Sequence, residues 1–206
     1  MISEPQQTPA QRRNLMFLGV AGGLGIASLV VLLATLLLTG TAAAGSAGRT
    51  ASGIVSTERY SAACLVTQYK DQGRAHTQNI KEQIPRNSFP PTSGMHYVGP
   101  ARWGNYTSPI AQIQGIHNLE HGGIVIQYGD RVSAADRDAL NAYYDKDPNG
   151  LLMAPLNSIG TRIAVTAWTH LMVCQKLDTR ALDKFKKTFR YKAPEALPKA
   201  ALEPGR

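Results

Sequence analysis

Residues 161–175 have the sequence TRIAVTAWTHLMVCQ, a long run rich in β-branched and aromatic residues. This composition is typical of β-strands, because branched and aromatic side chains pack well on a pleated surface. A second run of the same kind, GIVIQY, occupies residues 123–128. These two runs predict the strands around which the chain folds.

The strongest helix signal follows the longer run, in residues 178–191 (DTRALDKFKKTFRY). Leu182, Phe185 and Phe189 recur there at helical spacing, and most of the lysines fall on the other face. Asp178 is a suitable N-cap, since its carboxylate can accept a hydrogen bond from a free backbone N–H of the first turn. The pattern therefore predicts an amphipathic helix.

A second helix is predicted from Ser133, which forms an acidic variant of the capping box with Asp136 and should be followed by helix as far as Pro148. The order strand, helix, strand, helix favours an α+β fold, with a short, mainly antiparallel sheet and two helices. Residues 79–114 contain five prolines, which exclude long regular elements and predict a shaped loop.

Composition limits the possible classes of protein. The 206 residues allow one domain of ordinary size, and with 43% hydrophobic and 17% charged residues the chain is not wholly disordered. Lys and Arg number 22 against 14 Asp and Glu, but we find no nucleic-acid motif, Walker loop or dinucleotide fingerprint. We therefore expect no nucleic-acid partner.

Residues 15–38 contain no charged side chain. As a helix this run would span roughly 36 Å, enough to cross a bilayer core of about 30 Å. Arg12 and Arg13 directly precede it, so the positive-inside rule predicts a cytoplasmic N-terminus, residues 1–14, and a domain outside. The alternative is a cleaved signal, because the arginine pair loosely resembles a twin-arginine leader and residues 42–44 (AAA) offer a cleavage site.

The expected organisation beyond this run has three parts. Residues 39–53 consist almost entirely of Gly, Ala, Ser and Thr and predict a flexible linker. Residues 54–191 form the expected extracytoplasmic domain. Residues 192–206 contain three prolines and predict a disordered tail.

The two cysteines, Cys64 and Cys174, would lie in an oxidising compartment, which favours a disulfide between them. The alternative is a copper–thiolate site made of Cys174, His170 and Met172. Its ligand order differs from the usual arrangement around one loop, so we expect the disulfide.

Histidines dominate the polar chemistry of the chain. His117 and His121 lie four residues apart in HNLEHGG, residues 117–123, and share a face whether the segment is helical or extended. His96 follows a turn restricted by two prolines. Three imidazoles in one extracytoplasmic domain predict a metal site, with copper or zinc as the ion.

Glu120 has a role that depends on conformation, since only on a helix does it lie beside His117. The order H-x-x-E-H also matches an inverted zinc-peptidase motif, in which the glutamate activates water. Glu120 would then be the catalytic residue of a zinc-dependent hydrolase. Gly122 and Gly123 leave room for the required helix only upstream of the motif.

Four short motifs together resemble a bacterial family catalogued as domain of unknown function 3105. They are PPTSGMH at residues 90–96, WGNY at 103–106, HNLEHGGIVIQY at 117–128 and TAW at 166–168. The resemblance covers about residues 74–189 and implies an exported or membrane-anchored protein without an established activity. Carried over by position, the recurrent polar residues of that family are His76, His96, His117, Glu120 and His121.

One position departs from the family pattern. Met95 stands where the family usually has Pro before the histidine, which loosens the loop and adds a sulfur. Thioether is a soft ligand that suits copper.

These observations predict a membrane-anchored extracytoplasmic protein that binds copper or zinc through His96, His117 and His121, with His76 or Glu120 completing the ligand set. We expect it in the bacterial cell membrane, single-pass, with its C-terminal domain outside the cytoplasm. The alternatives are a non-catalytic accessory subunit of a membrane complex, with a membrane protein as partner, and the zinc-dependent hydrolase.

Overall fold

The computed structural model describes residues 53–206. The predicted cytoplasmic N-terminus (1–14), membrane helix (15–38) and all but the last residue of the predicted linker (39–53) lie outside the described residues. Within the described part, no helix combines the length and apolar character needed to cross a membrane.

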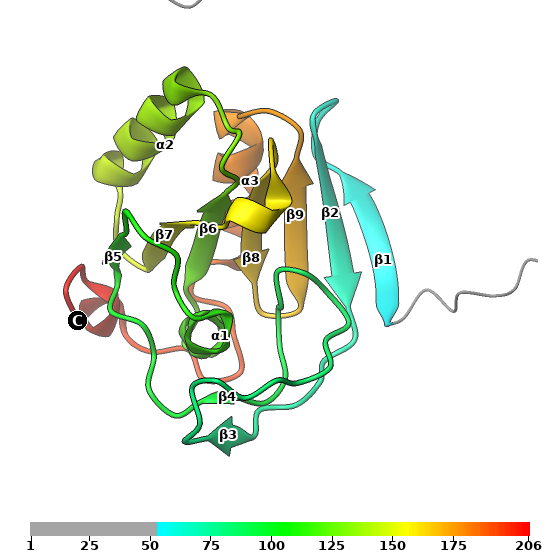
Figure 1. Ribbon diagram of the computed structural model, residues 1–206, viewed down its shortest axis with the longest axis vertical. Helices are drawn as coiled ribbons and strands as arrows, with labels where there is room; N and C mark the ends of the chain where they lie inside the picture. Colours follow the sequence, from blue (N-terminus) through cyan, green and yellow to red (C-terminus); the bar gives the residue numbers. More distant parts are fainter. Residues whose placement is uncertain (1–52) are drawn as a thin grey trace, which may run out of the picture. The chain divides into compact units, whose positions relative to one another are not determined.

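A seven-stranded sheet with the order β1-β2-β9-β8-β6-β7-β5 forms the centre of the domain (Figure 1). Its strands are β1 (Ile54–Arg59), β2 (Cys64–Tyr69), β5 (Gly104–Asn105), β6 (Ile124–Tyr128), β7 (Leu151–Pro155), β8 (Ile163–Ala167) and β9 (His170–Cys174). Neighbours from β1 to β6 pair antiparallel, whereas β7 runs parallel to β6 and β5. The α+β class and the mainly antiparallel sheet are confirmed, but the sheet is larger than predicted.

The run at residues 161–175 forms two strands and not one. Ala167 pairs with His170 in the antiparallel register of β8 and β9, so Trp168 and Thr169 make a two-residue hairpin turn. Thr169, the second residue of the turn, adopts a φ of 60°, in the left-handed region that favours glycine. The composition of the run predicted strand correctly but contained no Gly or Asn to mark the turn.

Both predicted helices are confirmed, together with their caps. In α2 (Ala134–Lys146), the Ser133 hydroxyl accepts from the backbone N–H of Asp136. In α3 (Thr179–Phe189), the Asp178 carboxylate accepts from the backbone N–H of Ala181. Local sequence signals fix these two ends, because each cap involves residues three apart.

A third helix, α1 (Gln112–Glu120), corrects the prediction of two helices. Its N-cap, Ala111, offers no side-chain hydrogen bond, and Gly115 lowers its helix propensity. Most of its residues are buried, including Ile116 and Leu119. Tertiary packing and not local preference therefore maintains this helix, which explains why the sequence pattern did not reveal it.

The sheet buries side chains on both faces. On one face, Ile124 and Ile126 of β6 pack in the cluster that contains Leu140 of α2 and Phe185 of α3. On the other, Val125 packs with Ile116 and Leu119 of α1. Successive strand residues point to opposite faces, so a strand buried on both sides is a continuous apolar run, as Ile124, Val125 and Ile126 are in β6.

The predicted disordered tail is instead packed against the domain. It contains the short 3₁₀ helix η2 (Lys199–Leu202), in which Leu202 is fully buried. The backbone N–H of Leu197 donates to the carbonyl of His121, and that of Gly205 to the carbonyl of Trp103. Prolines remove only their own donors, so an extended segment whose other donors find partners can still be ordered.

The predicted disulfide is confirmed: Cys64 and Cys174 are directly opposite each other on β2 and β9 and are bonded. Cys64 begins a strand and does not lie in a loop. Because the Cys174 sulfur is in the disulfide and Met172 is fully buried in the core, the alternative copper–thiolate site is excluded.

Candidate metal centre

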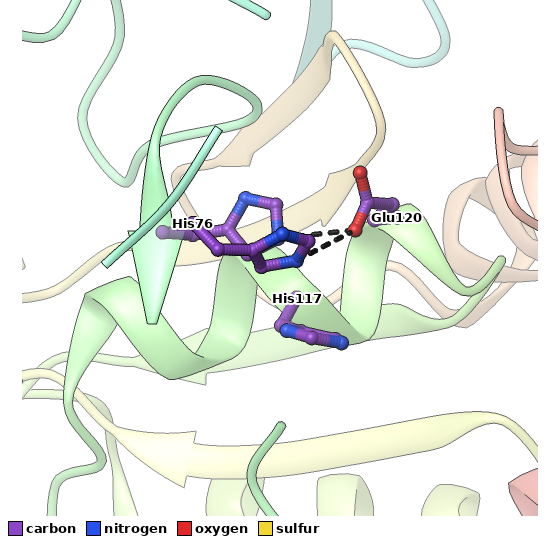
Figure 2. Close-up of side chains that lie close together, drawn as sticks. His76, His117 and Glu120 are labelled. Carbon is purple, nitrogen blue, oxygen red and sulfur yellow. Dashed lines mark hydrogen bonds and ion pairs between the residues drawn. The ribbon is translucent and has the colours of Figure 1, made fainter. Parts of the chain in front are cut away.

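The end of α1 presents polar side chains to the protein interior. His117, Asn118 and Glu120 are all buried. The Asn118 side chain accepts from the backbone N–H of Ala101 and donates to its carbonyl, which attaches the helix to the loop that precedes β5. His117 and Glu120 lie one turn apart and project from the same helix (Figure 2).

Two further histidines are supplied by a small parallel sheet, β3 (His76–Thr77) and β4 (His96–Tyr97), which lies close to α1 (Figure 1). In its register His76 is paired with His96, and the two ring centroids are 4.5 Å apart. Strand neighbours in register point to the same side of a sheet. Two imidazoles therefore face α1 together.

The loop before His96 is held in shape by hydrogen bonds to its backbone and side chains. Gly94 has a φ of +99°, which favours glycine, and a Cβ there would lie 2.7 Å from the Arg86 guanidinium. That guanidinium donates to the carbonyls of Ser93 and Met95. The Ser93 hydroxyl accepts from the backbone N–H of Gln72, so this serine acts as a structural residue of the loop.

His76, His96, His117 and Glu120 form one group whose ligand atoms all lie within 4.8 Å of one another, and this group can hold a metal ion. Glu120 Oε2 lies 3.0 Å from His96 Nε2 and 3.6 Å from His76 Nε2. Figure 2 shows His76, His117 and Glu120 gathered beside α1. The side chains of His96 and Glu120 are fully buried, whereas that of His76 is 40% exposed, so the group opens to solvent on the His76 side.

Backbone carbonyls set the tautomers of two of these rings. His96 Nδ1 donates to the carbonyl of Gly94 at 2.9 Å, and His117 Nδ1 donates to the carbonyl of Tyr97 at 2.9 Å. A carbonyl can only accept, so in the neutral rings both Nε2 atoms carry lone pairs. Histidines that ligate metals commonly make this contact through their other nitrogen.

The carboxylate of Glu120 lies next to the Nε2 atom of His96. With its Nδ1 proton donated to Gly94, a neutral His96 ring directs an Nε2 lone pair at Glu120 Oε2, which is itself an acceptor. The other oxygen, Oε1, is buried and has no hydrogen-bond partner in the part of the chain that the structure describes. A cation between the imidazoles and the carboxylate would satisfy the lone pairs on both sides.

Burial also keeps His117 available as a ligand. The pKa of His117 is lowered to about 4, chiefly by loss of solvation; the hydrogen bond to Tyr97 acts in the opposite direction, and the neighbouring histidines add to the lowering. Burial likewise lowers the pKa of His121. At neutral pH the His117 imidazole is therefore uncharged, the form that binds metals.

His121 lies at the C-cap of α1, beside the group and not within it. Its ring is 4.5 Å from that of His117, and its ligand atom groups instead with Glu120 and Glu195. Four of the five predicted metal-site residues thus converge, and the fifth is adjacent. His170 lies elsewhere, stacked on Phe189.

Two residues of the site had no recognisable sequence signal. Arg86 acts through backbone carbonyls, and Glu195 lies in the segment expected to be disordered. Only three-dimensional proximity identifies them.

The H-x-x-E-H order occupies the last turn of α1 and its cap, since the helix ends at Glu120 and His121 follows it. In the structure, the Glu120 carboxylate lies with His76, His96 and His117 as a fourth potential metal ligand. This arrangement differs from the expected peptidase site, in which His117 and His121 hold the ion and the glutamate remains free.

Comparison with protein-family models matches residues 76–201 to the family described as protein of unknown function (DUF3105). The match includes the four residues of the group, α1, both parallel strands of the small sheet and Glu195. Comparisons with curated proteins and with solved structures found no match. The matched residues cover more than half of the sequence, and the chain therefore belongs to the DUF3105 family, a family of unknown function.

Proposed function

We propose that the protein binds a divalent transition metal ion, zinc or Cu(II), through His76, His96, His117 and Glu120. The observation that carries the proposal is the orientation of two buried imidazoles, His96 and His117. Their Nδ1 atoms donate to backbone carbonyls, so their Nε2 atoms are the ones available as ligand atoms, and that of His96 lies 3.0 Å from the buried carboxylate of Glu120. Polar side chains buried this deeply are costly unless they have partners, and a bound cation would be such a partner.

The spacing of the group suits a tetrahedral ion. Zinc–nitrogen bonds of about 2.0 Å place neighbouring ligand atoms about 3.3 Å apart. The two contacts of Glu120 Oε2, at 3.0 Å and 3.6 Å, lie on either side of this value. The other pairs of ligand atoms in the group lie within 4.8 Å of each other, so the side chains would close around the ion when it binds.

The ligand types favour zinc or Cu(II) over Cu(I). The group consists of three imidazoles and one carboxylate. Met95, the residue that suggested a soft ligand, is 37% exposed, and Met172 is fully buried in the core. Imidazole with a carboxylate suits borderline divalent ions, whereas Cu(I) prefers sulfur.

Elemental analysis of the full-length chain tests this proposal. We expect purified protein, incubated with zinc or Cu(II) and then dialysed, to retain at least one equivalent of metal. His96→Ala should lose that equivalent, because it removes a buried ligand, whereas the matched variant His170→Ala should keep it. If neither the wild-type protein nor His170→Ala retained metal, this result would contradict metal binding and favour the accessory-subunit function.

We further propose that the N-terminal apolar run anchors the domain in the bacterial cell membrane, outside the cytoplasm. The support is the uncharged run at residues 15–38 preceded by Arg12 and Arg13. A disulfide between Cys64 and Cys174 is compatible with an oxidising compartment.

Reporter fusions made after Gly53 test this topology. A reporter that works only outside the cytoplasm should be active, and a reporter that works only inside should be silent. The opposite pattern would contradict the proposed location. Comparing the size of the mature chain with that of the full sequence would separate a retained anchor from a cleaved signal.

A further inference from the structure

A second group of potential ligands shares Glu120 with the first. Glu120, His121 and Glu195 offer ligand atoms that all lie within 4.8 Å of one another. We propose that this group holds a second divalent metal ion and that Glu120 bridges the two ions. The inference rests on the proposed function, because the first ion and the bridge use the same carboxylate.

The C-terminal segment places Glu195 at this position through backbone contacts. The N–H groups of Glu195 and Leu197 donate to the carbonyls of Glu120 and His121, and that of Tyr191 donates to the carbonyl of Gly122. These carbonyls lie at the end of α1, where helical partners are missing. The segment that completes the helix end thus also brings a carboxylate to it.

The proposed bridge assigns one carboxylate oxygen of Glu120 to each ion. Oε2 lies next to the Nε2 atoms of His96 and His76. Oε1 is buried, has no hydrogen-bond partner among residues 53–206 and points away from His76 and His117 (Figure 2). An unsatisfied carboxylate oxygen inside a protein is costly, and a second cation is the ligand that would satisfy it.

His117 and His121 are adjacent but serve different groups. Their rings lie 4.5 Å apart, nearly perpendicular. His117 belongs to the first group and His121 to the second. Side chains four residues apart on a helix are neighbours, so each imidazole can contribute to one of two closely spaced ions. Carboxylate-bridged ions in proteins are about 3.5 to 4 Å apart.

Arg74 holds Glu195 from the solvent side. Its guanidinium contacts Glu195 Oε1 at 3.1 Å, and both side chains are about half exposed. This contact engages one oxygen of Glu195 and leaves Oε2 for a metal. The second ion would have three protein ligands against four for the first, so it would keep a position open for water or a small anion.

Zinc titration of the chelator-treated full-length chain tests the proposal by stoichiometry. We expect two equivalents of zinc per wild-type chain. Glu195→Gln and His121→Ala should each bind one equivalent, because they remove ligands of the second ion only. Glu58→Gln is the matched control: Glu58 is also an exposed carboxylate in an ion pair, with Lys184 at 2.8 Å, and this variant should bind two.

The outcomes separate this inference from the proposed function. A single equivalent in the wild-type chain, unchanged in Glu195→Gln, would overturn the second ion and leave the first. No binding would overturn both. Cu(II) gives an independent measurement: the second equivalent should reduce or broaden the electron paramagnetic resonance signal of the first through coupling, and this effect should be absent in Glu195→Gln. Two equivalents of Cu(II) with additive, uncoupled signals would overturn the bridge.

Discussion

Removing the Cys64–Cys174 disulfide is expected to lower the free energy of unfolding by up to about 4 to 5 kcal/mol. The bond joins residues with a sequence separation of 110. A cross-link lowers the conformational entropy of the unfolded chain, and this loss of entropy grows with the length of the closed loop. The two cysteines are directly opposite each other on β2 and β9 and fully buried. The bond therefore joins the edge hairpin, β1 and β2, to the rest of the sheet.

Chemical denaturation of the Cys64→Ala/Cys174→Ala variant measures this contribution. Alanine removes the bond without burying a new polar group, and wild-type protein treated with a reductant should show a loss of the same size. A variant as stable as the oxidised wild type would contradict the expected contribution. Two free thiols in the folded, unreduced chain would show that the bond is absent.

Local signals were enough to predict much of the fold. The caps at Ser133 and Asp178 involve residues three positions away, so the sequence alone located α2 and α3. The apolar run at β6 was equally clear, because a strand buried on both faces needs no polar alternation. The ends of these elements depend on neighbours in the chain.

Two features maintained by distant contacts were not predicted, the helix α1 and the ordered C-terminal segment. The helix α1 has a glycine, no side-chain cap and several buried polar residues, and its stability depends on the sheet and on Ala101. The C-terminal segment looked disordered because its partners, the carbonyls of Glu120, His121 and Gly122, are more than 60 residues away.

In the candidate site, too, local sequence identified some residues and distant contacts identified others. The spacing of His117 and His121 placed them on one face, and the restricted loop singled out His96, both from local sequence. His76 was identified only through resemblance to a family, because its neighbour in space is His96, across the parallel pair β3 and β4. Glu195 had no pattern that linked it to Glu120, since backbone hydrogen bonds alone place it there.

Metal binding is expected to raise the thermal stability of the protein. An ion that binds only the folded state stabilises it by RT ln(1 + [L]/Kd), about 2.7 kcal/mol at a hundredfold excess over Kd. For a domain of this size the corresponding rise in the melting temperature is about 5 to 11 °C. The ligands come from β3, β4 and α1, segments that unfolding would separate, so affinity for the unfolded chain should be low.

His117→Ala is expected to abolish most of this rise, because it removes a ligand whose orientation is fixed by the Tyr97 carbonyl and whose imidazole is neutral at neutral pH. His170→Ala is the matched control, since His170 is also a partly buried histidine with a lowered pKa but stacks on Phe189, away from the group. Thermal denaturation of the full-length chain with and without zinc or Cu(II) measures both. Equal rises in the two variants would remove His117 from the ligand set. If zinc, Cu(II) and Cu(I) all leave the wild-type melting temperature unchanged, the histidines stabilise only the loop, and the accessory-subunit function would replace metal binding.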